Sequence, residues 1–155
     1  MPAASDPKRQ AVCDRIEAAG LVAIVRADQP DGVVECCRAL VEGGVTCLEI
    51  TLTTPNALEA ISQASRQLGD RATLGVGSVT SAKMVDDAVD AGATFVVAPV
   101  FKPEIVERSH HHAAPCVPGG LTPTEILTAH EAGADFIKVF PANHFGPKFF
   151  KDVLA

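Results

Sequence analysis

Two charged residues lie within segments that are otherwise largely apolar, and they are the best candidates for chemistry in the chain. Glu49 lies in the run Thr46–Ile50, and Lys138 lies in the run Asp135–Val139. Leaving a charged group buried without a partner is costly in free energy. Glu49 and Lys138 are therefore either partners of each other or parts of a functional site. The other five lysines lie in polar or helical surroundings.

The surroundings of Lys138 suit one reaction especially. Burial among apolar side chains favours a neutral amine, which can attack a carbonyl carbon and form a Schiff base. A carboxyl group on another strand, such as Glu49, could then move protons at the carbinolamine, the enamine and a substrate hydroxyl. A buried Glu–Lys ion pair without catalysis explains the same pattern, and the residue types alone leave both interpretations open.

Composition narrows the class of protein. The 155 residues are 47% hydrophobic and 21% charged, which is typical of one globular domain and excludes wholesale disorder. A net charge of -6 argues against binding to nucleic-acid phosphates. We expect no membrane span, because no apolar run approaches ~18–20 residues, and no secretory signal in MPAASDPKRQ. Five cysteines, an odd number, indicate reduced thiols in the cytoplasm.

Short apolar runs alternate with helical patterns along the chain. This alternation predicts βα units and a parallel sheet. Thr54-Pro55 and Thr122-Pro123 are typical helix starts, and Glu125 completes a capping box with Thr122. The six predicted strands are Leu21–Val25, Thr46–Ile50, Ala72–Val76, Thr94–Val97, Pro115–Val117 and Asp135–Val139.

Two architectures fit six βα units. A doubly wound sheet would be complete at this length, whereas a (β/α)₈ barrel needs eight units and typically about 200 residues or more. Length alone favours the doubly wound sheet. In a barrel, the two-residue period of a strand would turn Glu49 and Lys138 toward the interior. We divide the chain into an N-terminal helix and leader, residues 1–19, and a βα domain, residues 20–155.

Several segments, in order, resemble one enzyme family. They are LEITLTTPNALEAI, LGVGSVT, FVVAPVFKPEIV, CVPGGLTPTEILTAHEAGADFIKVFPA and FGPKFFK. They are similar to the class I aldolases for 2-keto-3-deoxy-6-phosphogluconate and 4-hydroxy-2-oxoglutarate, and to the related 2-keto-3-deoxy-6-phosphogalactonate aldolases. The resemblance runs from about Gly20 to the last residue. It implies a (β/α)₈ TIM barrel with about six units in this chain, and it overrides the argument from length.

The resemblance also implies roles for individual residues. Lys138 would be the Schiff-base lysine and Glu49 the general acid/base, in reversible cleavage of a 2-keto-4-hydroxy acid to pyruvate and an aldehyde. The family is usually a homotrimer and uses no metal or organic cofactor. Ser78, where the family usually has Thr, would help to hold the substrate carboxylate. The expected pocket-wall residues are Pro99, Pro118, Gly119 and Phe140.

The chain departs from the family pattern in two places. Many members carry Arg where this chain has Thr53, and a Thr hydroxyl cannot make the charge-assisted fork of a guanidinium. Arg26 could supply the missing charge, or it could be a solvated residue that starts a loop; both interpretations stay open. The chain also ends before strands seven and eight, which bind the substrate phosphate in this family. We therefore expect a truncated chain whose activity is weak or absent, with a non-catalytic subunit of the same fold as the alternative.

The run His110-His111-His112 does not suit a metal site. Successive helical residues point about 100° apart, so three in a row cannot converge on one ion. We expect these histidines to form a solvated helix end.

Overall fold

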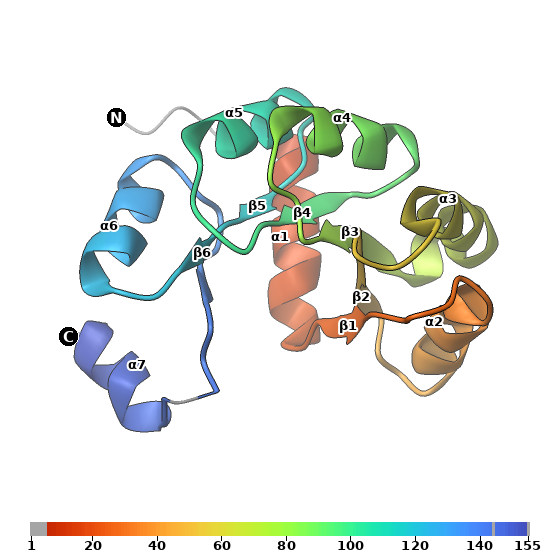
Figure 1. The fold of residues 1–155 in the computed structure, drawn as a ribbon, viewed down its shortest axis with the longest axis horizontal. Helices are drawn as coiled ribbons and strands as arrows, with labels where there is room; N and C mark the ends of the chain where they lie inside the picture. Colours follow the sequence, from red (N-terminus) through yellow and green to blue (C-terminus); the bar gives the residue numbers. More distant parts are fainter. Residues whose placement is uncertain (1–5, 144, 155) are drawn as a thin grey trace.

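The structure is a computed structural model that describes residues 6–143 and 145–154. Helices and short strands alternate through it (Figure 1). The strands are β1 (Ala23–Val25), β2 (Cys47–Thr51), β3 (Thr73–Gly77), β4 (Phe95–Val97), β5 (Cys116–Val117), β6 (Gly119–Gly120) and β7 (Lys138–Val139). The helices are α1 (Pro7–Ala19), α2 (Val33–Glu42), α3 (Ala57–Leu68), α4 (Ala82–Asp90), α5 (Pro103–His111), α6 (Pro123–Glu131) and α7 (Pro147–Val153), with a 3₁₀ turn, η1, at Gly69–Arg71.

All strand pairs are parallel, and the strands follow one another in chain order. The order is β1-β2-β3-β4-β5, and β6 pairs with β7 in a second ladder. A doubly wound sheet reverses its strand order at a switch point, and these ladders do not. The doubly wound alternative is therefore wrong. The strand order is that of successive units in the wall of a (β/α) barrel.

Pro118 separates β5 from β6, a short strand that lies beyond the predicted run Pro115–Val117. Proline has no N–H to donate to a ladder, so the regular pairing is interrupted at this residue. The Lys138 N–H nevertheless donates to the Pro118 carbonyl at 2.9 Å, and the Asp135 N–H donates to the Cys116 carbonyl at 3.2 Å. These bonds hold β7 beside the β5–β6 segment. Each of the six predicted runs contains a strand, which starts later than predicted in every case, and β2 and β3 each extend one residue further. The short strand β6 was not predicted.

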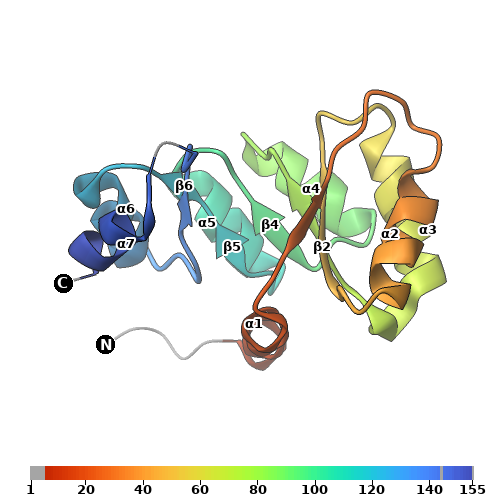
Figure 2. The same cartoon turned by 90° about the horizontal axis from the view of Figure 1, so that it is seen from below.

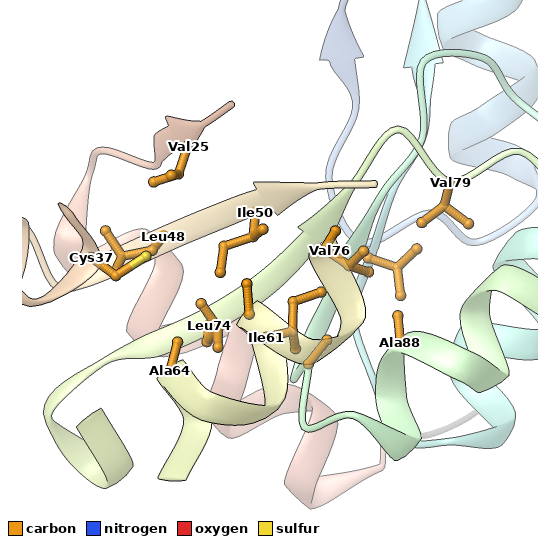
Figure 3. Close-up of a cluster of buried hydrophobic side chains, with 14 of the residues drawn as sticks. Val25, Cys37, Leu48, Ile50, Ile61, Ala64, Leu74, Val76, Val79 and Ala88 are labelled. Carbon is orange, nitrogen blue, oxygen red and sulfur yellow. The ribbon is translucent and has the colours of Figure 1, made fainter. Parts of the chain in front are cut away.

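The two faces of the sheet are covered differently. Helices α2–α5 lie along one face, while α1 lies against the other (Figure 2). The helix-covered face carries the larger core, in which Leu48, Ile50 and Val76 pack on Ile61 of α3 (Figure 3). On the opposite face, Val12 of α1 packs in a small cluster with Cys47, Phe95 and Val97.

The helix-start signals were correct at one site and wrong at another. At α6, Thr122 and Glu125 form the predicted capping box. At α3, the helix begins at Ala57 after the N-cap residue Asn56, two residues later than the signal at Thr54-Pro55 predicts. The Thr54 hydroxyl accepts the Ala27 N–H at 3.2 Å instead, so it ties two loops together.

The expectation of a solvated histidine run is also wrong for two of its three members. His110 is half-buried and its Nε2 lies 2.9 Å from the Asp135 carboxylate. His112 lies 2.6 Å from Asp86 of α4. His111 is exposed. Because His110 and His112 contact different carboxylates, they connect α5 to two separate parts of the fold.

Within the described ranges, none of the helices has the length and apolar character needed to cross a membrane.

Candidate active site

Most of the residues predicted for a site lie at or just beyond the carboxyl ends of the parallel strands. In parallel α/β folds this edge is where ligands bind. Arg26 directly follows β1 and Ser78 directly follows β3, while Thr53 and Pro99 each come two residues after the end of their strand. Pro118 and Gly119 lie at the β5–β6 junction, Lys138 begins β7, Phe140 follows it, and Glu49 is the central residue of β2.

Glu49 is held in the middle of the sheet. Its strand pairs with β1 on one side and β3 on the other, opposite Ile24 and Gly75, and its side chain is almost fully buried. Burial raises the pKa of the Glu49 carboxyl above its usual range, while the positive charges of Lys138 and Arg26 act in the opposite direction. A carboxyl with a raised pKa is suited to give and take protons near neutral pH.

Lys138 faces the same cavity as Glu49. The cavity has a volume of about 300 Å³, and its lining is otherwise apolar. The remaining lining residues are Ile16, Val22, Ile24, Phe95, Val97, Val117 and Phe136. The sequence-based expectation that Glu49 and Lys138 turn toward one interior space is therefore confirmed.

The ion-pair interpretation gains no support from the geometry. Among the residues that the structure describes, no salt bridge joins Glu49 to Lys138. The Lys138 ammonium instead lies 5.2 Å from the centroid of the Phe140 ring, a cation–π arrangement. Lys138 is half-buried, so its desolvation is less complete than the apolar strand predicts.

The two candidate carboxylate anchors differ in what holds them. Arg26 is exposed, and its charge reaches Glu49. Thr53 is exposed, and its hydroxyl is hydrogen-bonded to that of Thr51 at 3.0 Å. The charge of Arg26, which directly follows β1, thus acts on the Glu49 carboxyl, whereas Thr53 is tied to Thr51.

The wall residues pack closely where β6 meets the loop after β4. A Cβ atom built on Gly119 would lie 2.1 Å from the Pro99 carbonyl oxygen, so only glycine fits there. Ser78 is half-buried with a φ of 63°, a left-handed conformation that is uncommon outside glycine. Phe140 is 43% exposed and contacts the lysine rather than closing the cavity.

Two features of the site were missed by the sequence analysis. Gly75 and Gly77 belong to the extended strand β3, and both lie against inward side chains. Thr54 supports the turn that carries Arg26. For the two glycines, the available signal in the sequence was a G-x-G pattern in the strand after the one that carries Glu49. The role of Thr54 depends on a contact between two loops, which no local pattern indicates.

Comparison with known proteins identifies the family. The model for the family described as KDPG and KHG aldolase matches residues 12–155. The chain belongs to this family. A 2-dehydro-3-deoxy-phosphogluconate aldolase of Treponema pallidum is 34% identical over 144 residues, which cover 93% of this chain and 68% of that protein. A 2-dehydro-3-deoxy-6-phosphogalactonate aldolase of Escherichia coli K12 is 33% identical over 135 residues, which cover 87% of this chain and 66% of that protein.

Solved structures agree with the fold. The KDPG aldolase of Legionella pneumophila, with pyruvate captured as a covalent carbinolamine intermediate, superposes with a TM-score of 0.82 at 26% identity. The match covers 94% of this chain and 69% of that one. The 2-keto-3-deoxy-6-phosphogluconate aldolase of Zymomonas mobilis superposes with a TM-score of 0.80 at 30% identity, over 93% of this chain and 67% of that one. The fold is therefore of the TIM-barrel type, and this chain spans about two thirds of the length of these family members.

Proposed function

We propose that the chain is a class I aldolase of the KDPG/KHG type, with Lys138 as the Schiff-base residue. The observation that carries the proposal is that Glu49 and Lys138, from strands far apart in the sequence, line one largely apolar cavity. The names of the relatives support it, because they are aldolases for 2-dehydro-3-deoxy-phosphosugar acids. The proposed substrate is 2-keto-3-deoxy-6-phosphogluconate or 4-hydroxy-2-oxoglutarate, and the products are pyruvate and an aldehyde.

The chemistry follows from the two residues. The neutral Lys138 amine attacks the C2 carbonyl, and loss of water from the carbinolamine gives a Schiff base. Glu49 takes the proton from the C4 hydroxyl as the C3–C4 bond breaks, which releases the aldehyde and leaves an enamine on the lysine. Glu49 then returns a proton to C3, and water hydrolyses the imine to pyruvate and the free amine. No metal or organic cofactor enters this sequence.

The remaining site residues hold the keto acid. Arg26 binds the substrate carboxylate by a charge-assisted hydrogen bond, and the hydroxyl groups of Thr53 and Ser78 assist it. Pro99, Pro118 and Gly119 wall the pocket, and Phe140 lies beside the lysine. Thr53 alone could give only a neutral hydrogen bond, which is why the charge has to come from Arg26.

We further propose a homotrimer in the cytoplasm, in which each chain consists of an N-terminal helix and leader, residues 1–19, and a partial barrel domain, residues 20–155. One related chain, 32% identical over 85% of this chain, belongs to a protein cage designed by fusing symmetric oligomeric domains. This relative supports self-association of the family.

A specific observation favours a second candidate function. Ile24 on the outermost strand β1 is 53% exposed, and Lys138 on β7 is only half-buried. An aldolase lysine works best when it is desolvated. The alternative is therefore a chain of this fold with impaired catalysis, or a non-catalytic subunit.

Borohydride trapping with pyruvate, followed by peptide mass mapping, separates the two. The aldolase proposal expects a reduced pyruvyl adduct on Lys138 that is lost in Lys138→Arg and much slower to form in Glu49→Gln. The matched control is Lys148→Arg. Because Lys148 is exposed on α7, this variant should still form the adduct on Lys138. A folded protein that gives no adduct on Lys138 would favour the non-catalytic alternative.

A further inference from the structure

The carboxyl group of Glu49 lies directly against the backbone of Gly77. A Cβ atom built on Gly77 would lie 1.7 Å from Oε1 of Glu49, 2.5 Å from its Cδ and 2.8 Å from its Cγ. Real Cβ atoms do not approach other atoms this closely. The carboxyl thus occupies the volume that any side chain at position 77 would take.

The backbone at Gly77 does not itself require glycine. Gly77 is the last residue of the extended strand β3, and its φ is not positive, unlike those of Gly20 or Gly92. Other residues adopt extended backbone readily. Glycine is therefore needed at position 77 because Glu49 fills the space that a side chain there would take.

Ladder pairing also holds the backbone of Gly77 in place, so it cannot move away from Glu49. The Gly77 carbonyl accepts the Leu52 N–H at 2.9 Å, and Gly77 pairs with Thr51 in the β2–β3 ladder. An added methyl group would move with the ladder, so the flexible end of Glu49 would have to give way. Its free space lies toward the cavity that it shares with Lys138.

We infer that Gly77 is a positioning residue, which seats the Glu49 carboxyl over the carboxyl end of β3 and so sets where protons are delivered. The inference rests on the proposed function, in which Glu49 is the acid/base. Gly75 lies on the same face of β3 and does the same for the Phe95 ring, which a Cβ atom there would meet at 2.3 Å. The two glycines let β3 pass beneath two inward side chains.

The first test is a cycle of variants in the exchange of pyruvate methyl hydrogens with D₂O, a step that needs the acid/base. We expect Gly77→Ala to slow exchange about 100-fold, because a misplaced acid/base loses most of its advantage. In the Glu49→Ala background, Gly77→Ala should cause no further loss. Gly146→Ala is the control, since nothing lies within 4 Å of an added Cβ there. Wild-type exchange in Gly77→Ala, or a further loss in the Glu49→Ala background, would overturn the inference.

The second test does not depend on activity. In protein labelled with ¹³C at the Glu carboxyl carbons, the Glu49 signal is the one that Glu49→Ala removes. We expect Gly77→Ala to change both the position of this signal and its titration midpoint; an unchanged signal and midpoint would contradict the inference. If Gly77→Ala fails to fold, the Gly77→Ala/Glu49→Ala double variant should fold. Failure of both to fold would show that the space serves something other than Glu49.

The two proposals fail in different ways. A wild-type chain that forms no pyruvyl adduct on Lys138 defeats the proposed function, and the carboxyl titration then decides the role of Gly77 by itself. A chain that forms the adduct but tolerates Gly77→Ala keeps its function and loses only the positioning role.

Discussion

The Arg9 guanidinium lies 3.2 Å from the Asp135 carboxylate and so joins α1 to the segment that leads into β7. The other carboxylate oxygen of Asp135 contacts His110 and accepts the Cys116 N–H, each at 2.9 Å. Three regions of the chain thus converge on one side chain, three residues before Lys138. This arrangement fixes the start of the lysine strand against β5.

We predict that Asp135→Asn lowers the free energy of unfolding at pH 7 by about 3 kcal/mol, the cost of breaking a largely buried ion pair. Burial alone would raise the pKa of Asp135, but the hydrogen bonds from His110 and from the Cys116 N–H, together with the charges of His110 and Arg9, outweigh burial and lower it. A lowered pKa stabilises the fold above the carboxyl's unfolded pKa, and the effect is lost as pH falls through the folded one. Urea unfolding at a series of pH values measures this.

The control is Asp152→Asn. Asp152 pairs with Lys148 on the exposed surface of α7, where both side chains are mostly solvated. An exposed pair contributes little, so this variant should change stability by less than about 0.5 kcal/mol. Equal stability of Asp135→Asn and wild type at pH 7 would refute the role given to Asp135.

At neutral pH the buried Glu49 carboxylate should destabilise the fold, in contrast to the carboxylate of Asp135. Burial raises the pKa of Glu49, so the fold favours the protonated carboxyl. The stability that this preference contributes is fully present below the unfolded pKa and is lost as pH rises through the folded pKa. Glu49→Gln should therefore raise Tm at pH 7–8 by about 2–4 °C, the shift expected for ~1 kcal/mol in a domain of this size. The gain should vanish near pH 4, as scanning calorimetry would reveal. A lower Tm for Glu49→Gln at pH 8 would mean that the charged carboxylate is stabilising.

Much of the fold could be predicted because it depends on local patterns. The apolar runs mark the strands, and the two-residue period turns Glu49 and Lys138 to one side. Length alone favoured the wrong architecture, because six parallel units suit a doubly wound sheet as well as part of a barrel. Strand order decides between them, and strand order is a property of contacts between distant residues.

The parts that could not be predicted share this dependence on distant contacts. The Thr54 hydroxyl looks like a helix cap in sequence, but in the structure it accepts the Ala27 N–H. His110 and His112 look like a solvated helix end, but they contact Asp135 and Asp86. Gly77 belongs to a G-x-G pattern in the sequence, but its role becomes visible only once Glu49 lies beside it.

The cysteines give a prediction about reactivity. Cys13, Cys37, Cys47 and Cys116 are buried, and burial raises the pKa of the first three thiols to about 11 and that of Cys116 to about 12. Since the thiolate is the reactive form, these four should be inert at pH 8. A disulfide reagent should therefore titrate one thiol in native protein, the exposed Cys36, and five in denaturant. Cys36→Ser should abolish the native reaction; rapid reaction of a second thiol would indicate local opening of the fold.

Arg26 provides the sharpest test of how the site binds its ligand. If its guanidinium anchors the pyruvate carboxylate, Arg26→Ala should weaken pyruvate binding by about 10- to 100-fold, the range expected for loss of a hydrogen bond to a charged group. Arg26→Lys keeps the charge but loses the planar fork, so its affinity for pyruvate should lie between those of wild type and Arg26→Ala. The pyruvate concentration that gives half-maximal borohydride inactivation measures this affinity. Unchanged affinity in Arg26→Ala would assign the carboxylate to Thr53 and Ser78, and would leave Arg26 as a solvated residue whose charge acts only on Glu49.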